Sequence, residues 1–291
     1  MFFDKIAPFF VRKENMPSQE TFDDVFPDIP DTHTPGANGC LDDRRPRKYS
    51  DVVGQQQTIR RLKKLNQTTN LKGQRIAFVG PTGSGKTTLA TITARNRYCE
   101  HSQVLGDACG VCNLCVKTQI DYHSYQEWTG AELNENWEWW AQNGSIFLER
   151  DTNFLFVDEI QDLSESHQKY LFRELERARA TIVIATTHEN EVNDALWGRF
   201  GINKFYLRRP TEDDAVELMT CKAKELGINV TREQLKRVAR KYQLNLRICI
   251  DFVYSAKEQV ENSSVTEEFL ESVIGPAEIS ESAAIPKRAR L

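Results

Sequence analysis

Short apolar runs alternate with helical patterns between residues 44 and 209. Three runs read as buried strands, each too short and too rich in β-branched or aromatic residues for a helix: Arg75–Gly80 (RIAFVG), Phe154–Val157 and Thr181–Ala185 (TIVIA). Three segments around them read as helices: Gln55–Asn66, Thr87–Tyr98 and Ser164–Arg179. This alternation predicts an α/β domain over 44–209, with a mainly parallel sheet covered on both faces.

The pattern changes after Pro210, where strand-like runs stop. Four segments read as helices: Glu212–Glu225, Arg232–Tyr242, Leu246–Gln259 and Thr266–Ile274. We therefore expect a small all-helical domain over 210–275, followed by a short basic tail over 276–291.

Residues 1–43 show little periodicity and are broken by several prolines and glycines. We expect a disordered leader. A docking segment is the alternative, because this stretch holds many aromatic residues: Phe2, Phe3, Phe9, Phe10, Phe22 and Phe26.

Composition narrows the class of protein. The chain has 291 residues, 40% of them hydrophobic and 27% charged, which is ordinary for a globular protein of two compact units. Its formal net charge is -4, whereas a dedicated DNA-binding domain is usually basic overall. No stretch approaches the ~18 apolar residues of a membrane span, and the N-terminus lacks the continuous apolar core of a signal peptide. We expect a cytoplasmic protein without membrane contact.

Residues 80–87 read GPTGSGKT and fit the phosphate-binding pattern G-x-x-x-x-G-K-[ST] at every fixed position. The motif follows a predicted strand and opens a predicted helix, which is the context it requires. Backbone N–H groups of such a loop face the phosphate oxygens, Lys86 contacts the β- and γ-phosphates, and Thr87 ligates Mg²⁺. The expected nucleotide-binding residues are Gly80, Pro81, Thr82, Gly83, Ser84, Gly85, Lys86, Thr87 and Thr88.

Two acids, Asp158 and Glu159, end the apolar run FLFV. Ligands of open parallel sheets bind at the carboxyl ends of the strands, so we expect this pair to face the phosphate loop. Asp158 would hold Mg²⁺, and Glu159 would polarise the water that attacks the γ-phosphate. Solvated acids at a surface strand end are the alternative.

Four of the seven cysteines cluster as Cys99-x9-Cys109-x2-Cys112-x2-Cys115. An odd number of cysteines in a chain without a signal peptide argues against a disulfide framework. Four soft ligands close a tetrahedral site, so we expect a structural zinc ion over 99–115. His101 could replace one ligand, and reduced buried cysteines are the alternative.

Together these residues resemble the AAA+ region of the bacterial DNA polymerase III gamma/tau subunit, the motor of the sliding-clamp loader. The resemblance spans Arg45 to Gly275 and includes Arg45-Pro46 and the segment YSDVVGQ (49–55), which is similar to the adenine-holding segment and brings in Val53. The cysteine module falls directly after the phosphate-loop helix, where gamma subunits carry a zinc knuckle.

The resemblance implies three further functional residues. Thr187 matches the polar sensor beside the acidic pair, with Thr186 as the fallback. Arg199 matches the arginine finger that reaches the γ-phosphate of a neighbouring subunit. Arg247 matches the nucleotide-sensing arginine of the helical lid domain. A surface salt bridge is the alternative for each arginine.

The sequence departs from gamma subunits at the finger, where Gly198-Arg199-Phe200 replaces Ser-Arg-Cys. The segment GRFGI (198–202) is closer to the finger region of the Holliday-junction branch-migration motor. The helical collar domain of clamp loaders is not expected after Gly275. These departures favour a divergent, phage-type version of the clamp-loader subunit.

The implied function is an ATPase that uses ATP and Mg²⁺, assembles with other AAA+ subunits in a ring, and loads a sliding clamp onto DNA. The basic run Arg60, Arg61, Lys63 and Lys64 could contact DNA phosphates, although a solvated helix face explains it equally well. Two alternatives stay open: a DNA-remodelling motor of the branch-migration kind, and a scaffold that binds nucleotide without hydrolysing it.

Overall fold

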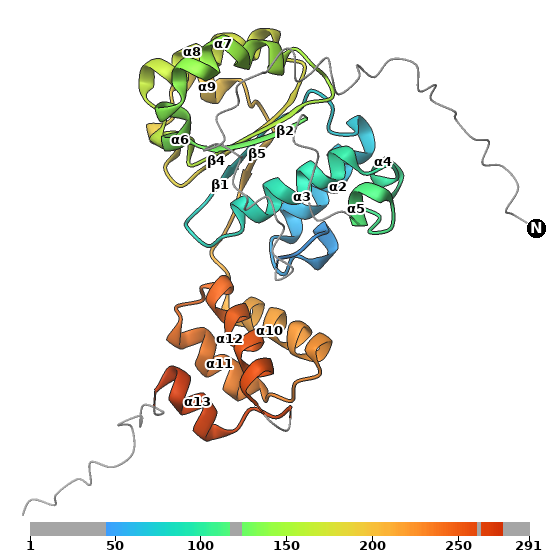
Figure 1. The fold of residues 1–291 in the computed structure, drawn as a ribbon, viewed down its shortest axis with the longest axis vertical. Coiled ribbons are helices and arrows are strands. Elements are labelled where there is room, and N and C mark those ends of the chain that lie inside the picture. The colour runs from blue at the N-terminus through green and yellow to red at the C-terminus, as the bar shows by residue number, and fades with distance from the viewer. Residues whose placement is uncertain (1–44, 117–123, 261–262, 276–291) are drawn as a thin grey trace, which may run out of the picture.

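A computed structural model describes residues 45–116, 124–260 and 263–275. The leader over 1–43, which includes Cys40, and the tail over 276–291 lie outside the described residues. Figure 1 shows two units joined by one connection: an α/β unit that contains the sheet, and a helical unit that follows it.

The sheet has five parallel strands in the order β2-β3-β4-β1-β5. Their bounds are Arg75–Val79 (β1), Tyr125–Thr129 (β2), Phe154–Asp158 (β3), Thr181–Thr186 (β4) and Lys204–Tyr206 (β5). The three predicted strands are confirmed and form the centre. The sequence did not predict the two edge strands, because β2 carries polar residues at Gln126 and Glu127 and β5 has only three residues.

Side chains of the central strands alternate between two buried faces. Phe78 and Phe156 pack against α2 (Gln56–Thr69) and α3 (Lys86–Tyr98). The neighbouring residues, such as Val157, face the opposite side with a second apolar cluster. Helices on that side are α6 (Gly130–Glu135), α7 (Trp137–Leu148), α8 (Glu165–Arg177) and α9 (Asp194–Gly198). Burial on both faces explains why the central strands are continuously apolar.

Short elements complete the α/β unit. They are the 3-10 helices η3 (Tyr49–Asp51), η4 (Ile160–Asp162) and η5 (Glu189–Glu191), and the single-turn helices α4 (Ser102–Leu105) and α5 (Asn113–Val116). The two single-turn helices lie in the cysteine module, beside α2 and α3 in Figure 1.

The helical unit consists of α10 (Glu212–Leu226), α11 (Arg232–Lys241), α12 (Leu246–Gln259) and α13 (Glu267–Ile274), so the four predicted helices are found. It has its own apolar core, in which Met219, Leu235 and Phe252 are buried. Each helix begins after a residue whose side chain accepts hydrogen bonds from N–H groups of the first turn. These capping residues are Thr211, Thr231, Asn245 and Thr266. In the described ranges, no helix has the length and apolarity to cross a bilayer.

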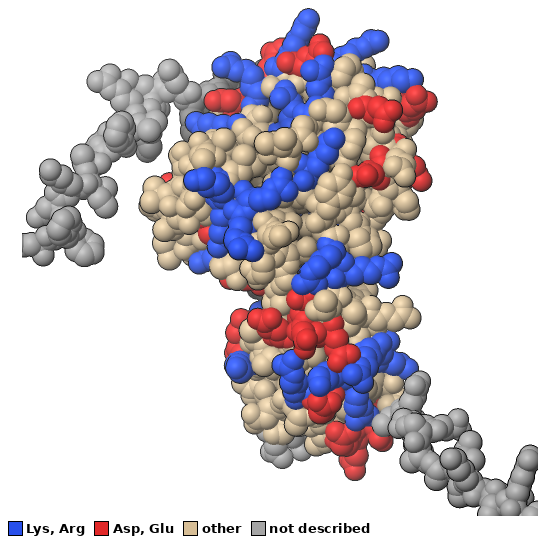
Figure 2. All heavy atoms as spheres, turned by 180° about the vertical axis from the view of Figure 1, so that it is seen from behind, with Lys and Arg blue, Asp and Glu red and all other residues tan. Residues whose placement is uncertain are grey.

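Charges are distributed unevenly over the face shown in Figure 2, where basic side chains form a band across the α/β unit and acidic ones gather on the helical unit near the junction. The basic run of α2 is partly engaged within the chain. Arg61 donates to the carbonyl oxygen of Ile202 (2.7 Å), and Lys63 pairs with Asp107 (3.0 Å). Arg60 and Lys64 are exposed and remain the better candidates for contact with a partner.

Candidate nucleotide-binding site and cysteine module

The phosphate loop connects β1 to α3 and depends on glycine. A Cβ on Gly80 would lie 2.8 Å from the carbonyl oxygen of Leu207 and 2.9 Å from Ser84 Oγ, so a larger residue would displace the loop. Gly85 caps α3 with a φ of 96°, a left-handed conformation that favours glycine. The loop thereby places its backbone N–H groups at the start of α3, as phosphate binding requires.

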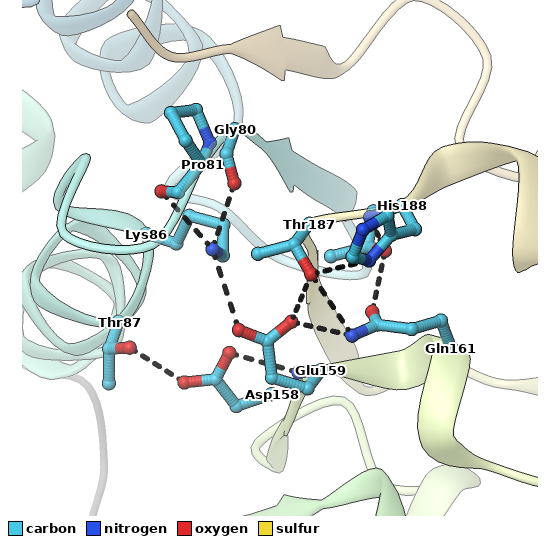
Figure 3. Close-up of polar contacts among 10 residues, drawn as sticks. Gly80, Pro81, Lys86, Thr87, Asp158, Glu159, Gln161, Thr187 and His188 are labelled. Atoms are coloured by element: carbon cyan, nitrogen blue, oxygen red, sulfur yellow. Dashed lines mark hydrogen bonds and ion pairs between the residues drawn. The ribbon is translucent and has the colours of Figure 1, made fainter. Parts of the chain in front are cut away.

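Lys86 lies between this loop and the acidic pair (Figure 3). Its side chain is only 5% exposed, and its Nζ donates a 2.9 Å hydrogen bond to the carbonyl oxygen of Gly80. A weaker contact of 3.5 Å reaches the carbonyl oxygen of Pro81, and Nζ also lies 3.5 Å from Glu159 Oε1. The ammonium group is thus held where a triphosphate bound to the loop would meet it.

Thr87 and Asp158 lie opposite each other at the carboxyl edge of the sheet. Thr87 Oγ1 donates a 2.6 Å hydrogen bond to Asp158 Oδ2, while the N–H of Glu159 donates to Asp158 Oδ1 (2.9 Å). Burial raises the pKa of Asp158, and the Glu159 charge adds to this, against the Thr87 hydrogen bond. A hydroxyl and a carboxylate are hard oxygen ligands, so this pair fits Mg²⁺.

Glu159 has partners on both carboxylate oxygens. Oε1 faces Lys86, while Oε2 accepts hydrogen bonds from Gln161 Nε2 (2.8 Å) and Thr187 Oγ1 (3.1 Å). Burial alone would raise the pKa of Glu159, but the Gln161 hydrogen bond and the Lys86 charge lower it. The carboxylate is therefore ionised near neutral pH, as an acceptor of a water proton must be.

The end of β4 brings both candidate sensor residues to the acidic pair. Thr187, the first choice from the resemblance, contacts Glu159 directly. Thr186, the fallback, is buried and instead donates a 2.6 Å hydrogen bond to Gln161 Oε1. His188 Nδ1 lies 2.9 Å from Thr187 Oγ1. Gln161 and His188 were not predicted from the sequence, because no fixed spacing marks a residue that acts through a neighbour.

A cavity of about 290 Å³ lies between the phosphate loop and the helical unit. The expected residues Val53, Thr87 and Arg247 line it, together with loop residues 82–86 and Thr88. Pro210, Leu246 and Ile250 also line it and were not predicted. Gly80 and Pro81 do not line the cavity; they contribute carbonyl oxygens to Lys86 instead.

Arg199 lies apart from this cavity, at the C-terminal end of α9. It forms an ion pair with Glu176, and its guanidinium lies 4.5 Å from the centre of the Phe172 ring. A surface salt bridge was the alternative that the sequence left open for Arg199, and Arg199 does form such a salt bridge with Glu176. Its position outside the cavity of its own chain is also what a finger for a neighbouring subunit requires, so that role stays a prediction.

The four clustered cysteines converge as predicted, with all four sulfurs within 4.8 Å of one another. Cys109 and Cys115 are 3.9 Å apart, and Cys99 and Cys112 are 4.0 Å apart. Zn–S bonds of about 2.3 Å place the sulfurs of a tetrahedral site about 3.8 Å apart, so the donor set fits zinc. His101 is not one of the converging ligands.

Backbone N–H groups support this donor set. The N–H groups of Val111 and Cys112 donate to Cys109 Sγ at 3.4 and 3.3 Å. Although burial opposes them, these bonds and side-chain hydrogen bonds from His101 and Cys112 lower the pKa of Cys109 to about 5, which favours its thiolate. Burial instead raises the pKa of Cys99, and it raises the pKa of Cys115 to about 12. Two other cysteines lie elsewhere, Cys221 exposed and Cys249 buried in the helical unit.

Comparison with known proteins supports the fold. Residues 76–206 match the ATPase family associated with various cellular activities (AAA). The RuvB Holliday junction branch migration motor of Thermotoga maritima has a similar structure, with a TM-score of 0.59 at 19% identity over 81% of this chain and 76% of that one. This similarity shows the AAA P-loop fold alone.

Several curated relatives are replication proteins. A replication factor C small subunit of Methanosphaera stadtmanae is 26% identical over 80% of this chain and 67% of its own length. A replication factor C large subunit of Pyrococcus abyssi is 24% identical, over 71% and 40% respectively. The DNA polymerase III subunit gamma/tau of Mycoplasma pneumoniae is 26% identical, over 70% and 30%. The chain thus spans less than half of two of these three relatives.

Proposed function

Because residues 76–206 form an AAA domain related to replication factor C and DNA polymerase III gamma/tau subunits, we propose that this protein is the ATPase subunit of a sliding-clamp loader. It would couple ATP binding and hydrolysis to the loading of a clamp on DNA during replication. One observation carries the proposal: Lys86 and Thr87 of α3 meet Asp158 and Glu159 of β3 at the carboxyl edge of the sheet.

ATP would occupy the cavity between the sheet and the helices that follow Pro210, which act as a lid. Loop N–H groups and Lys86 would bind the phosphates, and Val53 and Arg45, which also line the cavity, would contact the adenine base. Arg247, on the lid side, contacts the triphosphate and links its presence to the angle between the units. Thr87 and Asp158 would hold Mg²⁺, and this ion would neutralise phosphate charge.

Glu159 would orient and polarise the attacking water, because its carboxylate is ionised and held by Thr187. Arg199 of a neighbouring subunit would complete the site. To do so it must exchange Glu176 for the γ-phosphate, so hydrolysis depends on assembly. Arginine fingers contribute about 10³–10⁵ in rate in related phosphoryl-transfer enzymes.

The proposed partners are other AAA+ subunits in a ring, a sliding clamp, and primer-template or duplex DNA, and we expect the complex to act in the cytoplasm. A structural zinc ion at residues 99–115 would stabilise the module beside α2 and α3. Its four ligand positions are taken by cysteines, so we assign it no chemistry.

ATP turnover by the assembled complex tests this function. We expect clamp and primer-template DNA together to stimulate the wild type. The Lys86→Ala variant should lose nucleotide binding, whereas Glu159→Gln should keep binding and lose about 10²–10⁴ in turnover. Equal turnover by wild type and Glu159→Gln would remove Glu159 from its assigned role.

A branch-migration motor is the second candidate, favoured by the segment GRFGI at the finger. Stimulation by four-way DNA junctions without a clamp would support this motor and contradict clamp loading. A non-hydrolysing scaffold is the third candidate. Tight nucleotide binding without turnover in the complete assembly would select the scaffold.

A further inference from the structure

Gln161 lies in η4, directly after the acidic pair, and connects Glu159 to the end of β4 (Figure 3). Its Nε2 donates to Glu159 Oε2 (2.8 Å) and to Thr187 Oγ1 (3.2 Å). Its Oε1 accepts from Thr186 Oγ1 (2.6 Å). One side-chain amide therefore contacts three residues of the site.

The orientation of this amide is fixed by the Glu159 carboxylate, which can only accept hydrogen bonds. The backbone N–H of His188 donates to Thr186 Oγ1 (3.0 Å), so this hydroxyl acts as acceptor there and directs its own hydrogen elsewhere. That hydrogen goes to Gln161 Oε1. Rotating the amide by 180° would point Oε1 at the Glu159 carboxylate, so that two acceptors would face each other without a hydrogen between them. The N–H₂ group of Gln161 therefore faces Glu159 and donates to it.

The backbone that carries Glu159 and Gln161 is also constrained. Glu159 has a φ of 46°, in the left-handed region that non-glycine residues seldom adopt. Gly130 packs against it: a Cβ on Gly130 would lie 2.5 Å from the carbonyl oxygen of Glu159 and 2.8 Å from the N atom of Leu163. Strained backbone of this kind persists where surrounding contacts enforce it, and it clusters at functional sites.

We propose that Gln161 is a positioning residue that holds the Glu159 carboxylate against the end of β4, so that Oε1 is presented to the attacking water. The inference rests on the proposed ATPase function. In the described structure Oε1 contacts Lys86, whereas Oε2 contacts Gln161 and Thr187. When Lys86 turns to the phosphates, Gln161 and Thr187 are the contacts that keep Glu159 in place.

Replacing Gln161 by methionine tests this role, since methionine has a similar length and cannot donate. We expect the Kd for Mg-ATP to stay unchanged while kcat falls about 10- to 100-fold, the size of effect that a small misplacement produces. Gln234→Met is the matched control: Gln234 is 8% exposed and donates to Val265 and Glu267 in the helical unit, away from the acidic pair. This control should keep its kcat.

A double-mutant cycle separates positioning from a general structural effect. Adding Gln161→Met to Glu159→Gln should cause no further loss of kcat, because the carboxylate that Gln161 positions is gone. Additive losses would overturn the proposal. If the wild type turns over ATP and Gln161→Met matches it, the inference fails while the proposed function stands.

A readout without turnover completes the test. In protein labelled with ¹³C at glutamate carboxyl groups, the Glu159 resonance is assigned by its disappearance in Glu159→Gln. We expect this resonance to shift or broaden in Gln161→Met and to stay in place in Gln234→Met. An unchanged resonance in Gln161→Met would overturn the inference, whether or not the chain hydrolyses ATP.

Discussion

The nucleotide site and the cysteine module are held together in different ways, although α3 links them. Thr87 and Asp158 are 71 positions apart in the chain and meet because two fully buried central strands and α3 fix them. The cysteine module lies within residues 99–115, and its core consists of the four sulfur atoms with Ala108 and Leu114. The first site depends on apolar packing, and the second has too little apolar surface to order itself.

This difference predicts that the two regions respond to different perturbations. Burial of a sheet core stabilises the nucleotide site before any ligand binds. A loop with a core of thiols would depend on a bound metal, because finger-like modules gain most of their folding free energy from metal binding. We therefore expect that removal of the metal unfolds the module locally while the sheet stays intact.

Metal removal should have the largest effect. Zinc contributes roughly 10–16 kcal/mol to finger-like modules, so a strong chelator should abolish the protection of amides 99–115 in hydrogen exchange. Amides of β1, β3 and β4 should remain protected. Cys112→Ser should behave like the chelator, and Cys221→Ser, which changes an exposed thiol, should not. Equal protection of the module with and without metal would contradict the comparison.

Truncation of the sheet core should instead affect the nucleotide site. Phe156 is fully buried among the residues that face α3, so Phe156→Ala should lower the free energy of unfolding by about 3–5 kcal/mol. Urea unfolding measures this change, and nucleotide binding should weaken with it. Tyr206→Ala is the control, because Tyr206 is 60% exposed. A loss below about 1 kcal/mol at Phe156 would mean that the sheet does not hold the site.

The contact between the module and α2 should matter least. Lys63 is one-third exposed and pairs at 3.0 Å with the buried carboxylate of Asp107, which keeps hydrogen bonds from the N–H groups of Tyr49 and Ser50 when Lys63 is removed, so we expect a loss of about 1 kcal/mol or less. Lys63→Ala should therefore change the melting temperature only slightly, and less at high salt. A large loss would show that this ion pair, rather than the metal, anchors the module.

The sequence predicted those parts of the molecule whose chemistry is local. The phosphate loop and the cysteines are recognisable because their spacing along the chain is itself the requirement. Asp158 and Glu159 were found because they end an apolar strand. The edge strands β2 and β5 were missed, since one carries two adjacent polar residues and the other has only three residues.

Contacts between segments that lie far apart in the chain could not be predicted from the sequence. Gln161 reaches the end of β4 only because β3 and β4 are neighbours in the sheet. The spacing of residues along the chain does not reveal which strands are neighbours. The pairing of Arg199 with Glu176 likewise depends on how α9 packs on α8. Such residues become visible only when the fold brings the segments together.

Binding of Mg-ATP to the purified chain, alone and in its natural assembly, tests the central claim most directly. Calorimetry should show one nucleotide per chain in the wild type, and no binding by Lys86→Ala at the same concentrations. If the wild type, with its melting temperature intact, binds no adenine nucleotide in either form, then the meeting of Lys86 and Thr87 with the acidic pair has been given the wrong function.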